Sequence, residues 1–125
     1  MANKKSISLA LLDIMKKYTD ENHILSANEI IGILKKEYGL ELERRTLYSN
    51  LELLVQFGYS ISFWEENGKG YFLQERNISK EDVFMLCDMI LGSELSRKKK
   101  EKITDALLDE LSVYQRQKYR KEWKL

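Results

Sequence analysis

Apolar residues recur at intervals of three and four along most of this chain, which is the spacing of amphipathic helices. Such runs cover residues 6–19, 26–38, 43–57, 79–92 and 96–114. Ser26 and Glu29 have the spacing of a capping box at the start of the second run, and Ser79 is positioned to cap the fourth. Gly39 stands at the end of the second run, where a helix favours glycine. The pattern predicts five helices, and the basic, aromatic segment 114–125 is expected to fray.

The stretch after the third predicted helix changes from helical spacing to alternation. Gly58 is positioned to end the helix, and residues 59–64 then alternate between Tyr, Ile or Phe at odd positions and Ser or Trp at even positions. Residues 66–70 contain two glycines and an Asn-Gly pair, which suit a tight turn, and residues 71–73 are apolar enough to return as a second strand. The pattern predicts a helix that runs directly into a short β-hairpin.

A helix followed by such a hairpin is typical of the second half of a winged helix-turn-helix. The short connection between the second and third predicted helices fits the turn of that motif. We therefore expect a mainly α fold with a small β-hairpin, in which a winged helix-turn-helix domain over residues 1–76 precedes a C-terminal helical appendage over residues 77–125. The length of 125 residues and the hydrophobic content of 43% agree with an ordered domain of this kind.

Charge is distributed unevenly along the chain. Residues 1–96 carry 11 basic and 15 acidic side chains, whereas residues 97–125 carry 10 basic and 5 acidic ones. The chain as a whole has a formal net charge of only +1, so it is not the strongly basic object expected of a nucleic-acid binder. The positive charge is concentrated at the C-terminal end.

The sequence contains no constellation that favours an enzyme, a metal site or a cofactor site. Cys87 is the only cysteine, which excludes an internal disulfide, and its apolar surroundings favour a buried, inert thiol. His23 has no further ligand at metal-binding spacing. No apolar run approaches the roughly 20 residues that span a bilayer. The expectation is a cytoplasmic protein that is not an enzyme, has no cofactor and does not enter a membrane.

The segment from Arg45 to Leu73 resembles the N-terminal winged helix of the WYL-domain transcriptional regulators, which are related to the DeoR type. The matching positions are Arg45, Thr46, Leu47, Asn50, Leu51, Leu54, Gly58, Tyr59, Ile61, Gly70, Tyr71 and Leu73. The resemblance covers roughly residues 6–110 and is most specific between Arg45 and Leu73. Ser49 stands where the family usually has an arginine. The ligand-sensing domain that names the family is expected to be absent, since the chain ends after the helices.

This resemblance implies that the chain is a sequence-specific transcription regulator that binds double-stranded DNA, and a repressor in particular. The recognition helix, residues 43–57, would enter the major groove, and the wing, residues 59–73, would follow the adjacent backbone. On a helical wheel Arg45, Ser49, Glu52 and Gln56 point away from Leu47. The candidate DNA-binding residues are Arg44, Arg45, Thr46, Tyr48, Ser49, Gln56 and Lys69. Asn50 falls nearer the core and is expected to lock the turn.

The sequence also indicates a second copy of the chain as a partner and leaves a protein as an alternative to DNA. A homodimer through residues 79–114 is expected, because the fourth predicted helix is apolar over more than one face, and Ile103, Leu107, Leu111 and Tyr114 offer a seam on the last. The alternative function is a winged helix that binds a protein, for example a mobile-element inhibitor of a host nucleic-acid enzyme such as an anti-CRISPR. The acidic character of residues 1–96 and the serine at position 49 favour that alternative.

Overall fold

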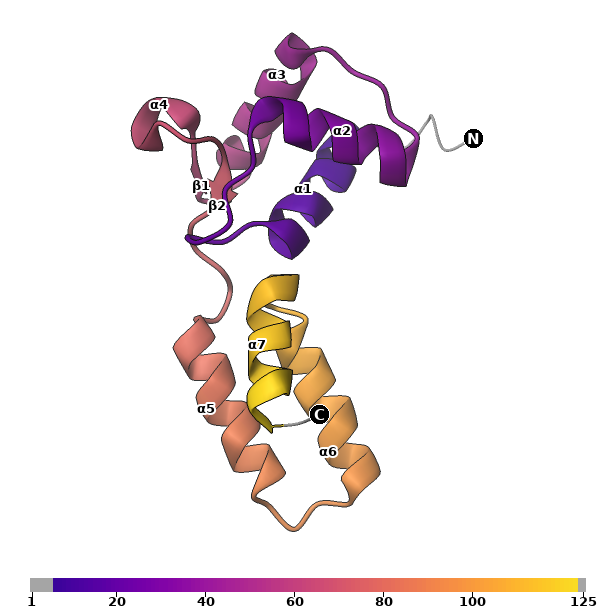
Figure 1. The fold of residues 1–125 in the computed structure, drawn as a ribbon, viewed down its shortest axis with the longest axis vertical. Helices are drawn as coiled ribbons and strands as arrows, with labels where there is room; N and C mark the ends of the chain where they lie inside the picture. The colour runs from indigo at the N-terminus through magenta and orange to yellow at the C-terminus, as the bar shows by residue number, and fades with distance from the viewer. Residues whose placement is uncertain (1–5, 124–125) are drawn as a thin grey trace. The chain divides into compact units, whose positions relative to one another are not determined.

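The computed structural model of the protein describes residues 6–123 and divides the chain into two compact units, Met1–Glu75 and Arg76–Leu125. The described residues are mainly helical, with a small antiparallel sheet of two strands in the first unit (Figure 1). The division falls one residue before the domain boundary that the sequence predicts.

Three helices form the body of the first unit: α1 (Ile7–Tyr18), α2 (Ala27–Tyr38) and α3 (Arg44–Gln56) (Figure 1). They pack around a core of fully buried aliphatic side chains: Leu11, Ile14, Met15, Ile30, Leu34, Leu47 and Leu51. These three predicted helices are confirmed, and their buried faces follow the helical spacing of the sequence. Val55 shares the helical spacing of the apolar residues of α3, yet it is exposed.

The ends of α2 are fixed by the residues that the sequence predicts. The Ser26 hydroxyl accepts from the Glu29 amide at 3.1 Å, and the Glu29 carboxylate accepts from the Ser26 amide at 2.8 Å. Gly39 adopts the left-handed conformation with φ of 65° and donates its amide to Lys35. The capping box and the glycine stop are therefore confirmed.

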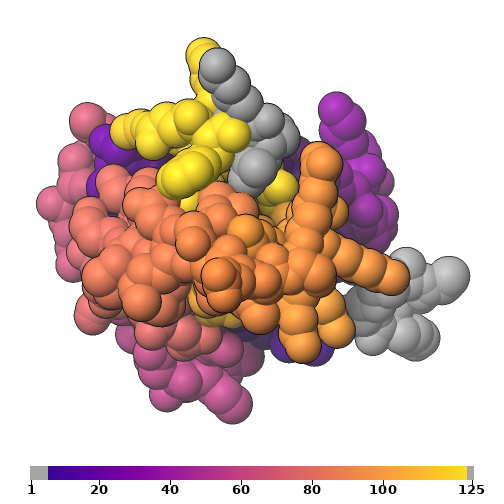
Figure 2. Space-filling view, turned by 90° about the horizontal axis from the view of Figure 1, so that it is seen from below, coloured from indigo at the N-terminus to yellow at the C-terminus, as the bar shows by residue number. Residues whose placement is uncertain are grey.

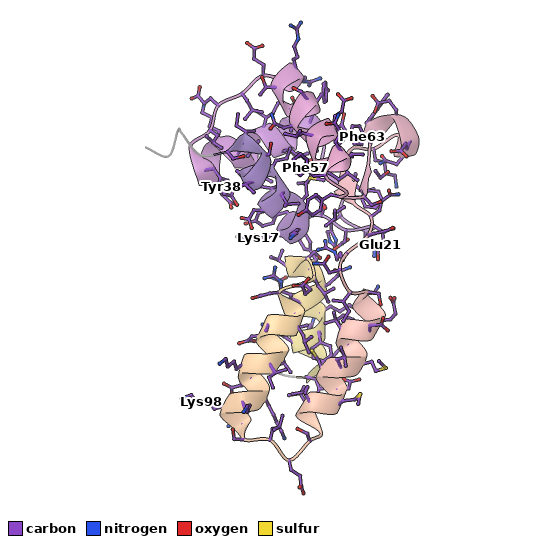
Figure 3. The ribbon with its side chains drawn as sticks, turned by 180° about the vertical axis from the view of Figure 1, so that it is seen from behind. Lys17, Glu21, Tyr38, Phe57, Phe63 and Lys98 are labelled. Atoms are coloured by element: carbon purple, nitrogen blue, oxygen red, sulfur yellow. The ribbon has the colours of Figure 1, made fainter. Side chains whose placement is uncertain are left out.

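The sheet is smaller than the predicted hairpin. Strand β1 (Ile61–Ser62) pairs antiparallel with β2 (Phe72–Leu73), and Ile61 lies opposite Leu73. The expected continuation of the first strand to residue 64 is wrong, because Trp64 begins α4 (Trp64–Asn67), a single helical turn (Figure 3). The Glu66 carboxylate accepts from the Phe63 amide at 2.8 Å and closes this turn, a contact that alternation along the strand does not reveal.

A third segment, the one that precedes α2, pairs with the chain at Tyr71, next to β2. The Leu25 amide donates to the Tyr71 carbonyl at 3.1 Å, and the Tyr71 amide donates to the Leu25 carbonyl at 2.7 Å. Thr19 links the end of α1 to β2. Its hydroxyl donates to the Met15 carbonyl at 2.6 Å and accepts from the Leu73 amide at 3.0 Å. The two-stranded sheet is thus anchored both to the end of α1 and to the residue that precedes the α2 cap.

The second unit contains α5 (Lys80–Leu91), α6 (Arg97–Leu108) and α7 (Val113–Trp123). Figure 2 looks onto the end of this unit at which α5 is joined to α6. The Ser79 hydroxyl caps α5 by accepting from the Asp82 amide at 3.1 Å, as the sequence predicts. Val83, Cys87, Leu108, Leu111 and Tyr119 form the buried core of the unit. Cys87 is buried as expected, and burial raises the pKa of its thiol, which keeps it protonated and unreactive.

The predicted single helix over residues 96–114 is wrong. Helix α6 ends at Leu108, and α7 starts directly after Ser112. The Ser112 hydroxyl accepts from the Gln115 amide at 3.2 Å, and the Gln115 side-chain oxygen accepts from the Ser112 amide at 3.1 Å. This is a second capping box. The expected fraying from residue 114 is also wrong, because α7 packs into the unit up to Trp123.

An aromatic cluster holds α7 against α5. The ring of Tyr119 is buried and lies 5.0 Å from the ring of Phe84, measured between centroids. The Tyr119 hydroxyl and the Trp123 indole both donate to one carboxylate oxygen of Asp88, at 2.7 and 3.0 Å. Burial and this bond raise the pKa of Tyr119, so the phenol remains a donor at all ordinary pH. Val83, Phe84 and Cys87 of α5 therefore pack within the unit.

Candidate nucleic-acid interface

One face of α3 is turned away from the core over its whole length. This outward face carries Arg45, Ser49, Glu52 and Gln56, and all four are exposed. Leu47 and Leu51 occupy the opposite face and are fully buried. Because these buried residues fix the rotation of the helix, the direction of the outward side chains follows from core packing. The wheel drawn from the sequence is confirmed for exposure; contact with DNA stays a prediction.

The side chains at the N-terminal end of this face are available for a ligand. Among the described contacts, the Arg45 guanidinium makes neither a hydrogen bond nor an ion pair. The Ser49 hydroxyl donates to the Arg45 carbonyl at 2.9 Å, which leaves its oxygen free to accept. Thr46 is half-buried, and its carbonyl accepts from the Asn50 amide group at 2.8 Å. Arg45 is therefore the prominent donor at the start of α3.

Asn50 joins α3 to α1. Its side-chain oxygen accepts from the Ser8 hydroxyl at 2.6 Å, while its nitrogen donates to the Thr46 carbonyl. The amide is thus used within the protein, as the sequence analysis expects of a residue nearer the core. These two bonds fasten the first half of α3 to α1.

Arg44, Tyr48 and Lys69 come together in a separate pocket. It has a volume of about 460 Å³ and lies between the N-terminal turns of α2 and α3 and the turn formed by α4 and residues 68–71. The Arg44 guanidinium is oriented by Asn28, whose side-chain oxygen accepts from it at 2.8 Å. Three of the seven candidate residues thus line one cavity; Arg45, Thr46, Ser49 and Gln56 do not line it.

The turn that carries Lys69 is organised by Asn67. The Asn67 side-chain oxygen accepts from the amides of Lys69 and Gly70 at 2.7 and 2.9 Å. Its nitrogen donates to the Ser62 hydroxyl and to the Gly70 carbonyl, both at 2.9 Å. With Gly68 at φ of 73°, these bonds hold the backbone of the turn in one shape. Asn67 therefore positions Lys69. The Asn-Gly pair in the sequence predicts the turn but not the side-chain bonds of Asn67 that fix it.

Aromatic side chains form much of the remaining wall of the pocket. The rings of Tyr48 and Tyr71 lie 6.2 Å apart, and Phe63 meets Tyr71 edge-on at 5.5 Å. Burial raises the pKa of Tyr71 to about 12, and its hydrogen bond with Tyr48 adds to the rise. The Tyr71 phenol is therefore neutral near pH 7. Trp64 also lines the pocket, and its side chain is 55% exposed.

Sequence reasoning missed Asn28, Trp64 and Tyr71 as members of this site. Asn28 is an exposed residue in the first turn of α2, where nothing in the spacing distinguishes it from a solvated side chain. The alternation of residues 59–64 predicts Trp64 at the end of a strand instead. The sequence signal that could have indicated this site is the number of aromatic residues between positions 59 and 72. They are more than the core of so small a sheet can bury.

The charge around α3 is mixed. Glu41 and Glu43 precede the helix and are exposed, and Glu52 lies on the outward face about two turns after Arg45. Binding of phosphates would therefore depend on a few well-placed cations, since the local net charge is not positive.

Other kinds of site are not found in the described part of the chain. No group of three or more His, Cys, Asp and Glu side chains within residues 6–123 is arranged to hold a metal ion. None of the helices described is long and apolar enough to cross a membrane. Comparisons with protein-family models, with curated proteins and with solved structures find no match to this chain.

Proposed function

We propose that this protein is a winged-helix transcription regulator, a repressor that binds double-stranded DNA with α3 in the major groove and residues 59–73 on the adjacent backbone. The observation that carries the proposal is the outward face of α3, where Arg45 is exposed and has no partner among the described contacts. The resemblance of residues 45–73 to the WYL-domain regulators supports the same assignment.

The arrangement of the first unit supports a winged helix. Three helices precede two short antiparallel strands, and the bridge between Leu25 and Tyr71 adds a pairing partner from the segment in front of α2. Pairing between the segment before α2 and the segment after α3 supports this reading, because in a winged helix such pairing would hold the wing beside the recognition helix.

Five of the seven candidate residues have a direct role in this proposal. Arg45 would donate two hydrogen bonds to O6 and N7 of a guanine, a contact worth about 1–3 kcal/mol of discrimination. Ser49 and Gln56 lie further along the same face and would contact the next bases or the backbone. Arg44 and Lys69 are placed for phosphates, which position the protein without reading sequence.

A homodimer would offset the weak charge of one copy by doubling the phosphate contacts. The expected seam at Leu111 is not available, since Leu111 is buried inside the second unit, and Val83 and Cys87 of α5 are buried there too. What remains on α5 is Met85 and Met89, which are 53% and 64% exposed and four residues apart. We propose these two methionines as the centre of the dimer contact.

Sedimentation at micromolar concentration tests the dimer. The natural protein is expected to sediment as a dimer and a variant with Met85→Glu and Met89→Glu as a monomer. Leu9→Glu, which changes an exposed apolar residue of the first unit, is the control and should stay dimeric. A monomeric natural protein contradicts this part of the proposal.

Selection from a pool of random duplex DNA, at low and at moderate salt, tests the function itself. The expected result is enrichment of one sequence, arranged as an inverted repeat with half-sites about 34 Å apart if the protein is a dimer. Retention that disappears at moderate salt without enrichment of any sequence would contradict sequence-specific binding.

A second candidate function, binding of a protein, is favoured by apolar side chains on α3. Phe57 is 76% exposed at the C-terminal end of the helix (Figure 3), and Leu53 is exposed one turn before it. Exposed aromatic residues are typical centres of protein interfaces. Phe57→Ala separates the two functions, because it should leave DNA binding unchanged if DNA is the partner and should abolish binding if the ligand is a protein.

A further inference from the structure

The pocket between α2, α3 and α4 has features that a simple contact with the DNA backbone does not need. Its volume of about 460 Å³ lies within the range of ligand pockets, about 300–1,000 Å³. A phosphate on the outside of a duplex needs only exposed donors, whereas this cavity also has aromatic walls. The cavity is therefore large enough for a molecule that combines an anionic group with a ring.

The charged side chains of the pocket favour an anion. Arg44 and Lys69 both line it, and Glu65 is the one acid among the lining residues. Arg44 is held by a neutral amide, that of Asn28, so its charge is not neutralised by its partner. The Lys69 ammonium group has no hydrogen bond or ion pair among the described contacts, although the backbone beneath it is fixed by Asn67. Two cations from different elements thus face one cavity.

The aromatic side chains favour a flat ring. Trp64 exposes more than half of its surface although it is the largest side chain of the unit, and Tyr48 and Tyr71 contribute further ring surface. Nucleobases stack on such side chains, and every base has a face suited to this contact. The Glu65 carboxylate is an acceptor for the amino group of an adenine, guanine or cytosine.

We propose that this pocket binds a single nucleotide unit, with its phosphate between Arg44 and Lys69 and its base against Trp64. The unit is either a free nucleotide or an unpaired nucleotide within a strand. This binding does not depend on the proposed recognition of duplex DNA by Arg45, which lies outside the pocket. A free nucleotide in the pocket would occupy Arg44 and Lys69 and so compete with their contacts to a duplex.

Tryptophan fluorescence tests the proposal directly. The chain contains two tryptophans, so Trp123→Phe leaves Trp64 as the sole reporter in the pocket. Adenosine 5′-monophosphate is expected to change this fluorescence saturably. Adenosine and inorganic phosphate, which each lack one half of the unit, should each bind at least about tenfold more weakly. Calorimetry on the natural protein gives the same affinities without relying on the reporter.

Substitutions connect the binding to the named groups. Lys69→Ala and Arg44→Ala should each weaken binding of the monophosphate by roughly tenfold, as expected for a charge-assisted hydrogen bond. Trp64→Ala, measured by calorimetry, should weaken it by roughly 5- to 150-fold, the range of a lost stacking contact. Arg45→Ala is the matched control: it removes a neighbouring arginine and should leave nucleotide binding unchanged even if it abolishes binding to a duplex.

A tetranucleotide of deoxyadenosine distinguishes the two sources. Binding at least tenfold tighter than the monophosphate identifies a strand as the source, and equal affinity identifies a free nucleotide. Absence of saturable binding of either by calorimetry up to millimolar concentration would overturn the proposal. Equal affinities for adenosine and its monophosphate would overturn it too. Loss of duplex binding alone would leave it standing, because Arg45 is not part of the pocket.

Discussion

A methyl group at Gly70 would collide with the backbone of Leu25. A Cβ atom built on Gly70 lies 2.2 Å from the Leu25 carbonyl oxygen and 2.7 Å from its carbonyl carbon. Ordinary contact requires about 3.4 Å, so the two backbones would have to separate by about 1 Å. Backbone atoms cannot yield as the end of a long side chain can. Gly70→Ala therefore tests whether the segment before α2 really pairs with the second strand.

The magnitude follows from the two hydrogen bonds of this bridge. At 2.7 and 3.1 Å they would both stretch beyond bonding distance if the backbones separated by that amount. Each such bond contributes about 1 kcal/mol net, so we expect Gly70→Ala to lower the free energy of unfolding of the first unit by about 2 kcal/mol. For a unit of this size that corresponds to a fall in melting temperature of roughly 8–16 °C.

Gly32→Ala is the matched control, since it makes the same chemical change in the same unit. Gly32 is exposed within α2, and no atom lies within 4 Å of its added Cβ. Alanine in a helix is more favourable than glycine by about 1 kcal/mol, so this variant should melt higher than the natural protein. Fluorescence of Trp64 in the Trp123→Phe background follows the first unit alone. Equal melting temperatures for Gly70→Ala and the natural protein would refute the pairing.

Two further predictions concern tyrosines. Tyr119→Phe removes the buried donor to Asp88 and should lower the free energy of unfolding of the second unit by about 1.5 kcal/mol. Urea unfolding in a Trp64→Phe background, with Trp123 as the reporter, measures this change. An unchanged urea midpoint would mean that the bond contributes nothing. The pKa of Tyr71 is raised from 10.0 to about 12, so between these pH values the folded first unit retains a proton that the unfolded chain loses. The contribution of Tyr71 to the free energy of unfolding is therefore complete below pH 10 and is lost as the pH rises towards 12. Urea unfolding between pH 8 and 11.5 checks this, and Tyr71→Phe should make the decline shallower; an identical decline in the variant would contradict the assignment.

The helices could be predicted because their signals are local. The Ser26–Glu29 box and the Gly39 stop lie within one turn of the helix ends that they define, and the buried leucines of α3 repeat at helical spacing. The break between α6 and α7 was missed although it also has a local signal. The apolar residues Leu107, Leu108 and Leu111 keep helical spacing across the turn, and Asp109 itself keeps a helical backbone conformation, with φ of −64° and ψ of −16°. The capping box of Ser112 and Gln115 was the sign of a new start.

The pocket could not be predicted because it is made by tertiary contacts. Asn28 and Arg44 are 16 residues apart in the sequence and meet only when α2 and α3 pack against each other. Trp64 reaches the pocket because Glu66 closes a helical turn that the alternation of residues 59–64 obscures. By contrast, Arg45 could be assigned to the outward face because Leu47 and Leu51 fix the rotation of its helix.

The central claim is that α3 reads duplex DNA through Arg45, and the affinity of Arg45→Ala for the selected duplex tests it most directly. Lys36→Ala is the charge-matched control, because Lys36 is exposed in the last turn of α2. We predict that Arg45→Ala weakens binding by about 1–3 kcal/mol and relaxes the preference at one base pair, whereas Lys36→Ala changes neither. Equal affinity and unchanged sequence preference in the Arg45→Ala variant would contradict the account.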